Sequence, residues 1–133
     1  MLRATASLLL LVTSASAATS EYSADRAERD LATALAGRTP GKPVNCVDQS
    51  RLQGPEVIND RIIIYRQSGG KIWLTGVKPS CPALNGDMIL ITETFGTQLC
   101  RNDRFSTVPR GGGVPSAYCF FTDFTPYDKP AKQ

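Results

Sequence analysis

The side chains that could carry chemistry in this chain of 133 residues are carboxylates, lysines, tyrosines and four cysteines, because the sequence contains no histidine. Without an imidazole, the Ser-His-Asp and Cys-His arrangements of nucleophilic catalysis are excluded, and the most common general base and metal ligand is missing. Catalysis would have to use the remaining groups. The composition therefore favours a non-enzymatic protein that needs no cofactor.

An even number of cysteines in a short exported chain is typical of a disulfide framework. A four-thiolate zinc site is the alternative, but such sites take two ligands from one tight turn, and the sequence has no Cys-x-x-Cys pair to provide them. The same absence argues against a redox role. Of the three possible pairings we favour a local bridge and one that ties the first strand to the last: Cys81 with Cys100, and Cys46 with Cys119.

Two carboxylates held a few ångströms apart could act as general acid and base on a sugar. Asp60 follows Asn59 and Asp87 follows Gly86, positions where a short carboxylate usually accepts backbone hydrogen bonds in a turn. A turn or surface role is therefore expected, and a small carboxylate-based hydrolase remains an alternative function. The candidate carboxylates are Asp48, Glu56, Asp60, Asp87 and Asp103.

The segment from Val108 to Pro115 is rich in glycine and carries Arg110 between two prolines. Consecutive glycine amides can line an anion site, but the Lys-Ser/Thr and the following helix of a phosphate loop are missing, so a flexible connector is expected. An exposed loop presented to a partner is the alternative interpretation, with Val108, Pro109 and Arg110 as its contact residues. It would suit a secreted inhibitor of an envelope or foreign hydrolase.

Four aromatic side chains could form a binding face if they shared one side of a sheet: Tyr65, Trp73, Tyr118 and Phe120. Aromatic residues on strands more often pack in a core, so a core cluster is expected.

The first residues have the layout of a secretory signal peptide, with Arg3, the apolar run of residues 8–12 and the small residues 15–17. Cleavage after Ala17 is expected. The apolar run is far shorter than the roughly 20 residues that span a bilayer, so no stable membrane insertion is expected once residues 1–17 are removed. The 15 basic and 12 acidic residues are scattered, which argues against nucleic-acid binding. The expected location is the periplasm or the exterior.

Residues 18–43 are predicted to form an N-terminal helix, over about 24–36, followed by a proline and glycine linker. Ser23 is a candidate N-cap, and Gly37 can adopt the left-handed conformation that ends a helix. Residues 38–43 contain two prolines and a glycine, which cannot continue the helix.

From residue 44 to residue 124 the apolar pattern changes to the period of a strand. Residues 61–66 and 71–75 are separated by a glycine turn and predict a hairpin, and residues 88–93 and 98–100 predict a second one. Further short strands are expected at 44–47, 104–108 and 117–121, with a flexible tail at 125–133. The fold class is mainly β: an antiparallel meander of about six strands whose closure into a barrel stays open, with one N-terminal α-helix.

The order of these features resembles a family of small exported proteobacterial proteins classed only as a domain of unknown function. The resemblance implies a bacterial envelope location and brings no activity, substrate or catalytic residue. It covers residues 44–121 and rests on these segments: Val44-Asn45-Cys46-Val47, the strand Ile58 to Tyr65, Cys81-Pro82-Ala83-Leu84, Leu99 to Asp103, and Tyr118-Cys119.

Export, disulfides and the missing catalytic set together favour a non-enzymatic binding or structural module of the envelope, with an unidentified envelope protein or ligand as its partner.

Overall fold

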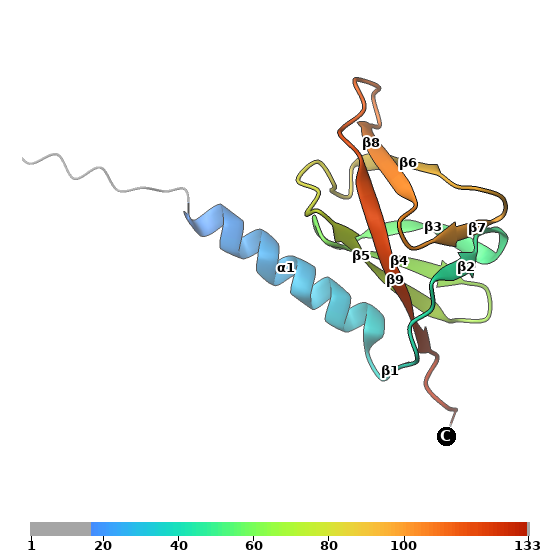
Figure 1. The fold of residues 1–133 in the computed structure, drawn as a ribbon. Coiled ribbons are helices and arrows are strands. Elements are labelled where there is room, and N and C mark those ends of the chain that lie inside the picture. The colour runs from blue at the N-terminus through green and yellow to red at the C-terminus, as the bar shows by residue number, and fades with distance from the viewer. Residues whose placement is uncertain (1–16, 133) are drawn as a thin grey trace, which may run out of the picture.

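The computed structural model describes residues 17–132, which form one helix beside a strongly curved β sheet (Figure 1). Residues 1–16, which hold the predicted signal peptide apart from Ala17, lie outside the described residues, as does Gln133. No helix in the described part of the chain is long and apolar enough to cross a membrane.

Helix α1 spans Ala17–Leu35. It is longer at its start than predicted, and Ser23 lies within it rather than at its N-cap, because nothing between Ala17 and Ser23 interrupts a helix and alanine favours one. Its end agrees with the prediction. Gly37 has φ +69°, and the Arg38 N–H donates to the Leu35 carbonyl at 3.0 Å. A glycine tolerates this backbone angle without strain, so it stops the helix.

The predicted linker and tail pair with each other. Strand β1 (Thr39–Pro40) runs antiparallel to the end of β9 (Cys119–Asp128), with Thr39 opposite Asp128. The Gly41 N–H donates to the Pro126 carbonyl at 2.7 Å, which fastens the rest of the linker to the same strand. Residues 125–128, expected in a flexible tail, therefore belong to the longest strand of the sheet.

The main sheet is antiparallel and has the order β3-β4-β5-β9-β8-β6, which confirms the predicted fold class of about six strands with one helix. The last strand, β9, lies between β5 and β8 rather than at an edge (Figure 1). The strands are β3 (Leu52–Val57), β4 (Ile62–Gln67), β5 (Ile72–Lys78), β6 (Met88–Glu93), β8 (Arg104–Pro109) and β9.

The predicted first hairpin is confirmed as β4 and β5, but the predicted second hairpin is wrong. Strand β6 pairs with β8, whereas β7 (Gln98–Cys100) pairs with β2 (Cys46–Asp48) in a separate ribbon. A short 3₁₀ turn, η1 (Gln49–Arg51), follows β2. The ribbon inserts Val47 and Leu99 into the core, and this burial favours the pairing with β2 over a local hairpin.

The sheet is nearly a barrel, and its two edge strands, β3 and β6, are not paired with each other. A hollow of about 310 Å³ lies between them, and its lining includes Pro55 of β3, Leu90 of β6 and Leu99 of β7. Because Pro55 has no N–H to donate, β3 cannot form a continuous ladder through this point. The β2–β7 ribbon instead covers the open side.

The core of the barrel is aromatic. The Phe105 and Phe121 rings lie 4.7 Å apart between centroids, and Phe124 is 6.0 Å from Phe121. All three side chains are fully buried, and Ile63 packs in the same cluster. Strands β4, β8 and β9 thus meet at one centre, which gives the functional surfaces outside it a rigid support.

Both disulfides form, with a pairing that differs from the predicted one: Cys46 with Cys100, and Cys81 with Cys119. Cys46 and Cys100 are directly opposite in the β2–β7 ladder. Lys78 at the end of β5 lies opposite Phe120 in β9, which brings Cys81 to the start of β9 at Cys119. Sequence proximity suggested the wrong partner because β7 turns away from β6 toward β2.

Candidate functional site

The five candidate carboxylates lie on five different segments, and two of them, Asp48 and Asp103, hold turns. Asp48 accepts hydrogen bonds from the Ser50 hydroxyl (2.7 Å) and the Ser50 N–H (3.0 Å), and these bonds hold the pKa of its carboxyl below the usual value. Asp103 accepts from the Cys100 N–H at 2.7 Å in the turn between β7 and β8. Both carboxylates thus accept backbone hydrogen bonds in a turn, which is the structural role expected of a short acidic side chain there.

The other three carboxylates have separate surroundings. Asp87 is exposed, and its own N–H donates to Asn85 Oδ1 at 3.0 Å. Glu56 forms two hydrogen bonds with the guanidinium of Arg66 across β3 and β4. Asp60 lies in the turn before β4, where its carbonyl accepts from the Cys81 N–H at 2.8 Å. Within residues 17–132 no group of three or more Cys, Asp or Glu side chains is placed to hold a metal ion.

The predicted partner loop is shorter than expected. Val108 and Pro109 belong to β8, where they lie opposite Ile89 and Met88, so two of the three proposed contact residues are in the sheet. Arg110 is exposed at the start of the loop proper. The far end of the loop is fixed to β8, because the Thr107 N–H donates to Ser116 Oγ at 3.0 Å.

The four aromatic candidates do not form one binding face. Tyr65 is buried beside Phe121, and burial raises the pKa of its hydroxyl. Trp73 is half-buried and donates to Gln67 Oε1 at 2.8 Å. Tyr118 is exposed, on the side of the sheet that carries Glu93. The expected core role therefore holds for Tyr65 and in part for Trp73, which packs against the core cluster.

Most of the large exposed apolar side chains gather around β6 and the two loops next to it. Ile89 and Ile91 are each 44% exposed, while their neighbours Met88 and Leu90 turn further inward, as expected for a half-buried strand. Phe95, in the turn after β6, is 97% exposed. In the loop before β9, Val114 is 89% exposed. We call Ile89, Ile91 and Phe95 the β6 surface.

A charged cluster around Glu93 lies between Ile91 and Phe95 of the β6 surface. Arg104 and Tyr118 both donate to the Glu93 carboxylate, at 2.7 Å and 2.9 Å, and the Arg104 guanidinium lies 4.4 Å from the centre of the Tyr118 ring. The hydrogen bond from Arg104 and then the one from Tyr118 lower the pKa of Glu93. The only charge on β6 is thus already engaged by neighbouring side chains.

A second surface feature is a cleft between α1 and the β3–β4 hairpin. Its wider part, about 800 Å³, is mainly apolar, with Ala27 and Leu31 of α1 facing Val57, Ile62 and Leu84. Its narrower part, about 540 Å³, is mainly polar and includes Arg38, Glu56, Arg66 and Lys129. Val57 and Ile58 line both parts, so the two hollows adjoin each other along the helix.

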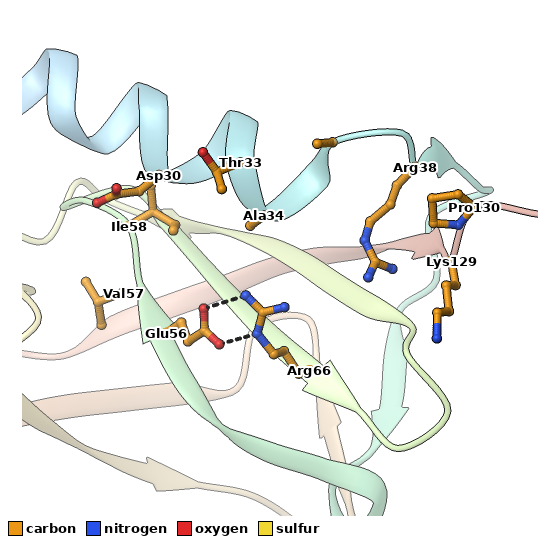
Figure 2. A pocket seen from close by; sticks show the side chains of 11 residues that line it. Asp30, Thr33, Ala34, Arg38, Glu56, Val57, Ile58, Arg66, Lys129 and Pro130 are labelled. Carbon is orange, nitrogen blue, oxygen red and sulfur yellow. Dashed lines mark hydrogen bonds and ion pairs between the residues drawn. The ribbon is translucent and has the colours of Figure 1, made fainter.

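Figure 2 shows the polar part, with the Glu56–Arg66 pair on its floor and Arg38 reaching in from above. Arg38 Nη1 donates to the Gly70 carbonyl at 2.5 Å, which ties the segment that follows α1 to the β4–β5 turn. The helix itself is fixed by little packing. Ala27 is its one buried side chain among those described, and Leu31, Ala34 and Leu35 are half-buried.

The model of a protein family of unknown function, DUF6491, matches residues 1–133 of the chain. The chain belongs to DUF6491. No curated protein and no solved structure matches it.

Membership of DUF6491 extends the resemblance found in the sequence. That resemblance covers residues 44–121, whereas the family match also includes α1 and the linker. The family match thus includes α1, which lines one side of the cleft.

Both surface features, the β6 surface and the cleft, include residues that the sequence patterns did not single out as candidate site residues. The apolar run of residues 88–91 predicted a strand, and on a strand Ile89 and Ile91 point to one face while Met88 and Leu90 point to the other. No pattern within a single segment of the sequence predicted the cleft. It is formed by residues from α1, β3, β4 and the tail, which only the tertiary structure brings together.

Proposed function

We propose that this protein is an exported, non-enzymatic binding module of the bacterial envelope that docks on a partner protein through the β6 surface. The observation that carries the proposal is a pair of exposed isoleucines on an edge strand. Edge strands are usually protected by charges or by a cover, because their free N–H and carbonyl groups can pair with another chain.

Strand β6 has little protection from charge, and the β2–β7 ribbon covers the gap toward β3 without pairing with β6. It pairs only with β8 in the described sheet, and its single charge, Glu93, is held by Arg104 and Tyr118. Two apolar side chains on the same face as a free edge suit the addition of a partner strand, in which the main chain provides affinity and alternate side chains provide specificity. Phe95 extends the apolar surface beyond the end of the strand.

Export is supported by the signal-peptide layout of residues 1–17 and by the two disulfides, which persist in oxidising compartments. The non-enzymatic character is supported by the missing histidine and by the turn-holding carboxylates. Turnover by the purified protein that a single carboxylate substitution abolishes would contradict it.

The test is site-specific photo-cross-linking in the expressing cell. A photoreactive residue at position 91 is expected to give a discrete protein adduct in the envelope fraction, and Ile89→Glu should remove that adduct. The control position is Ser68, which is exposed in the β4–β5 turn away from β6. No adduct at position 91, or the same adduct from position 68, would overturn the proposal.

A second candidate is the secreted inhibitor, and the exposure of the loop after β8 favours it. Residues 110–115 are all exposed, and the Ser116–Thr107 hydrogen bonds fix the end of the loop, as a segment inserted into an enzyme cleft requires. Arg110→Glu should weaken inhibition of the target hydrolase at least tenfold. Unchanged inhibition would exclude this loop as the inserted segment.

A further inference from the structure

We propose that the cleft between α1 and the β3–β4 hairpin binds a single-chain anionic amphiphile, with its anionic head near Arg38, Arg66 and Lys129 and its apolar chain between α1 and Ile62. This site is separate from the β6 surface, since no residue of β6 lines the cleft and α1 lies apart from β6 (Figure 1). The two proposals therefore succeed or fail independently.

The size and lining of the cleft suit a small ligand. Its apolar part, about 800 Å³, is within the range of roughly 300–1,000 Å³ typical of ligand pockets. Leu31, Ile58 and Ile62 lining it are only half-buried, so an apolar chain placed there would complete their burial.

Among the helix residues that line this space, Ala24 and Ala27 are small, whereas Glu28 and Leu31 are larger. Ala24 and Ala27 line the cleft at positions where larger residues would fill it. Since Ala27 is the only buried side chain described in α1, little apolar contact would be lost if the helix moved outward to admit a ligand. The linker contacts of Arg38 would keep the C-terminal end of the helix in place.

The charges determine which end of the ligand lies in which part of the cleft. In the polar part Arg66 is paired with Glu56, and Asp30 lies 3.8 Å from Arg26, whereas no carboxylate within the described chain forms an ion pair with Arg38 or Lys129. Figure 2 shows the guanidinium groups of Arg38 and Arg66 directed toward the same hollow. The apolar part has acidic residues instead, Glu28 and Asp60, which disfavour an anion there.

The experiment is isothermal titration of the disulfide-intact mature protein with three probes below their micelle concentrations. Dodecanoate tests the whole ligand, dodecyltrimethylammonium tests the same chain with the opposite head, and inorganic phosphate tests an anion without a chain. Dodecanoate should bind at least tenfold more tightly than either of the others. Equal affinity for the two amphiphiles, or no binding of dodecanoate, would overturn the proposal.

Matched variants locate the binding site. Ala24→Trp should fill the cleft and weaken dodecanoate binding at least tenfold, whereas Ala32→Trp, on the same helix but outside the cleft lining, should not. Lys129→Glu should weaken binding several-fold, and Lys42→Glu, an exposed linker residue, should leave it unchanged. Equal effects of a cleft variant and its control would place binding elsewhere and overturn the assignment.

Discussion

Cys46 and Cys100 lie directly opposite each other in the β2–β7 ladder, with their Cα atoms 4.0 Å apart, and their disulfide joins these two strands. The strands are three residues long each, and the ribbon is the part of the structure that covers the open side of the sheet. This bridge therefore stabilises the closure of the barrel as well as the ribbon.

Removing this bridge with Cys46→Ser and Cys100→Ser together should lower the free energy of unfolding by about 4 kcal/mol, the chain-entropy value for a loop of this size. The loop spans 54 residues. Urea unfolding followed by tryptophan fluorescence measures the change. Peptide mapping of the unreduced protein checks the pairing, and a peptide joining Cys46 to Cys119 would contradict the structure.

Substituting the central ring of the core, Phe121→Ala, should cost about 3–5 kcal/mol, because the side chain is fully buried between Phe105 and Phe124. The control is Phe95→Ala, at a position 97% exposed, which should leave the unfolding midpoint nearly unchanged. Chemical denaturation of both variants compares them. A similar cost at the two positions would show that the core is not organised around Phe121.

Gly76 lies at the register shift between β5 and β9, where a Cβ atom would come within 2.8 Å of Thr122 Oγ1. The Gly76 N–H also donates to that oxygen at 2.9 Å. Gly76→Ala should therefore destabilise the protein by about 1–3 kcal/mol, the usual cost of overpacking. Gly111→Ala is the control, because nothing lies within 4 Å of its added Cβ. Equal stability of the two variants would show that β9 shifts freely at this point.

The Glu93 cluster should be visible in titrations. Its hydrogen bonds lower the pKa of Glu93, so their contribution to stability is present above the ordinary carboxyl pKa of 4.5 and is lost as the pH falls through the lowered value. The hydrogen bond to Glu93 raises the pKa of Tyr118, so that contribution is present below the ordinary tyrosine pKa of 10.0 and is lost as the pH rises through the raised value.

Glu93→Gln separates these effects. Removing the carboxylate should bring the pKa of Tyr118 back toward its ordinary value, as measured by ultraviolet absorbance during an alkaline titration. Tyr65 is the internal reference, because burial rather than Glu93 raises its pKa. An unchanged Tyr118 titration in the variant would mean that the hydrogen bond to Glu93 does not form in solution.

The sequence by itself determined those turns, helix ends and strands that depend on only a few neighbouring residues. The glycine turn between β4 and β5 and the stop of α1 at Gly37 follow from backbone freedom within a few residues, and both are present. The β-branched residues of β4 likewise predict a strand wherever it is placed. The even number of cysteines predicted two disulfides, and both form.

The tertiary structure alone decided which elements meet. The sequence of β3 gave little indication of a strand, because Gly54 and Pro55 disfavour strands. The segment is a strand because it pairs with β4. The partners of β7, the insertion of β9 between β5 and β8 and both disulfide pairings depend on burial of residues far apart along the chain. Burial of apolar surface has no preferred sequence separation, so patterns of a few residues cannot specify it.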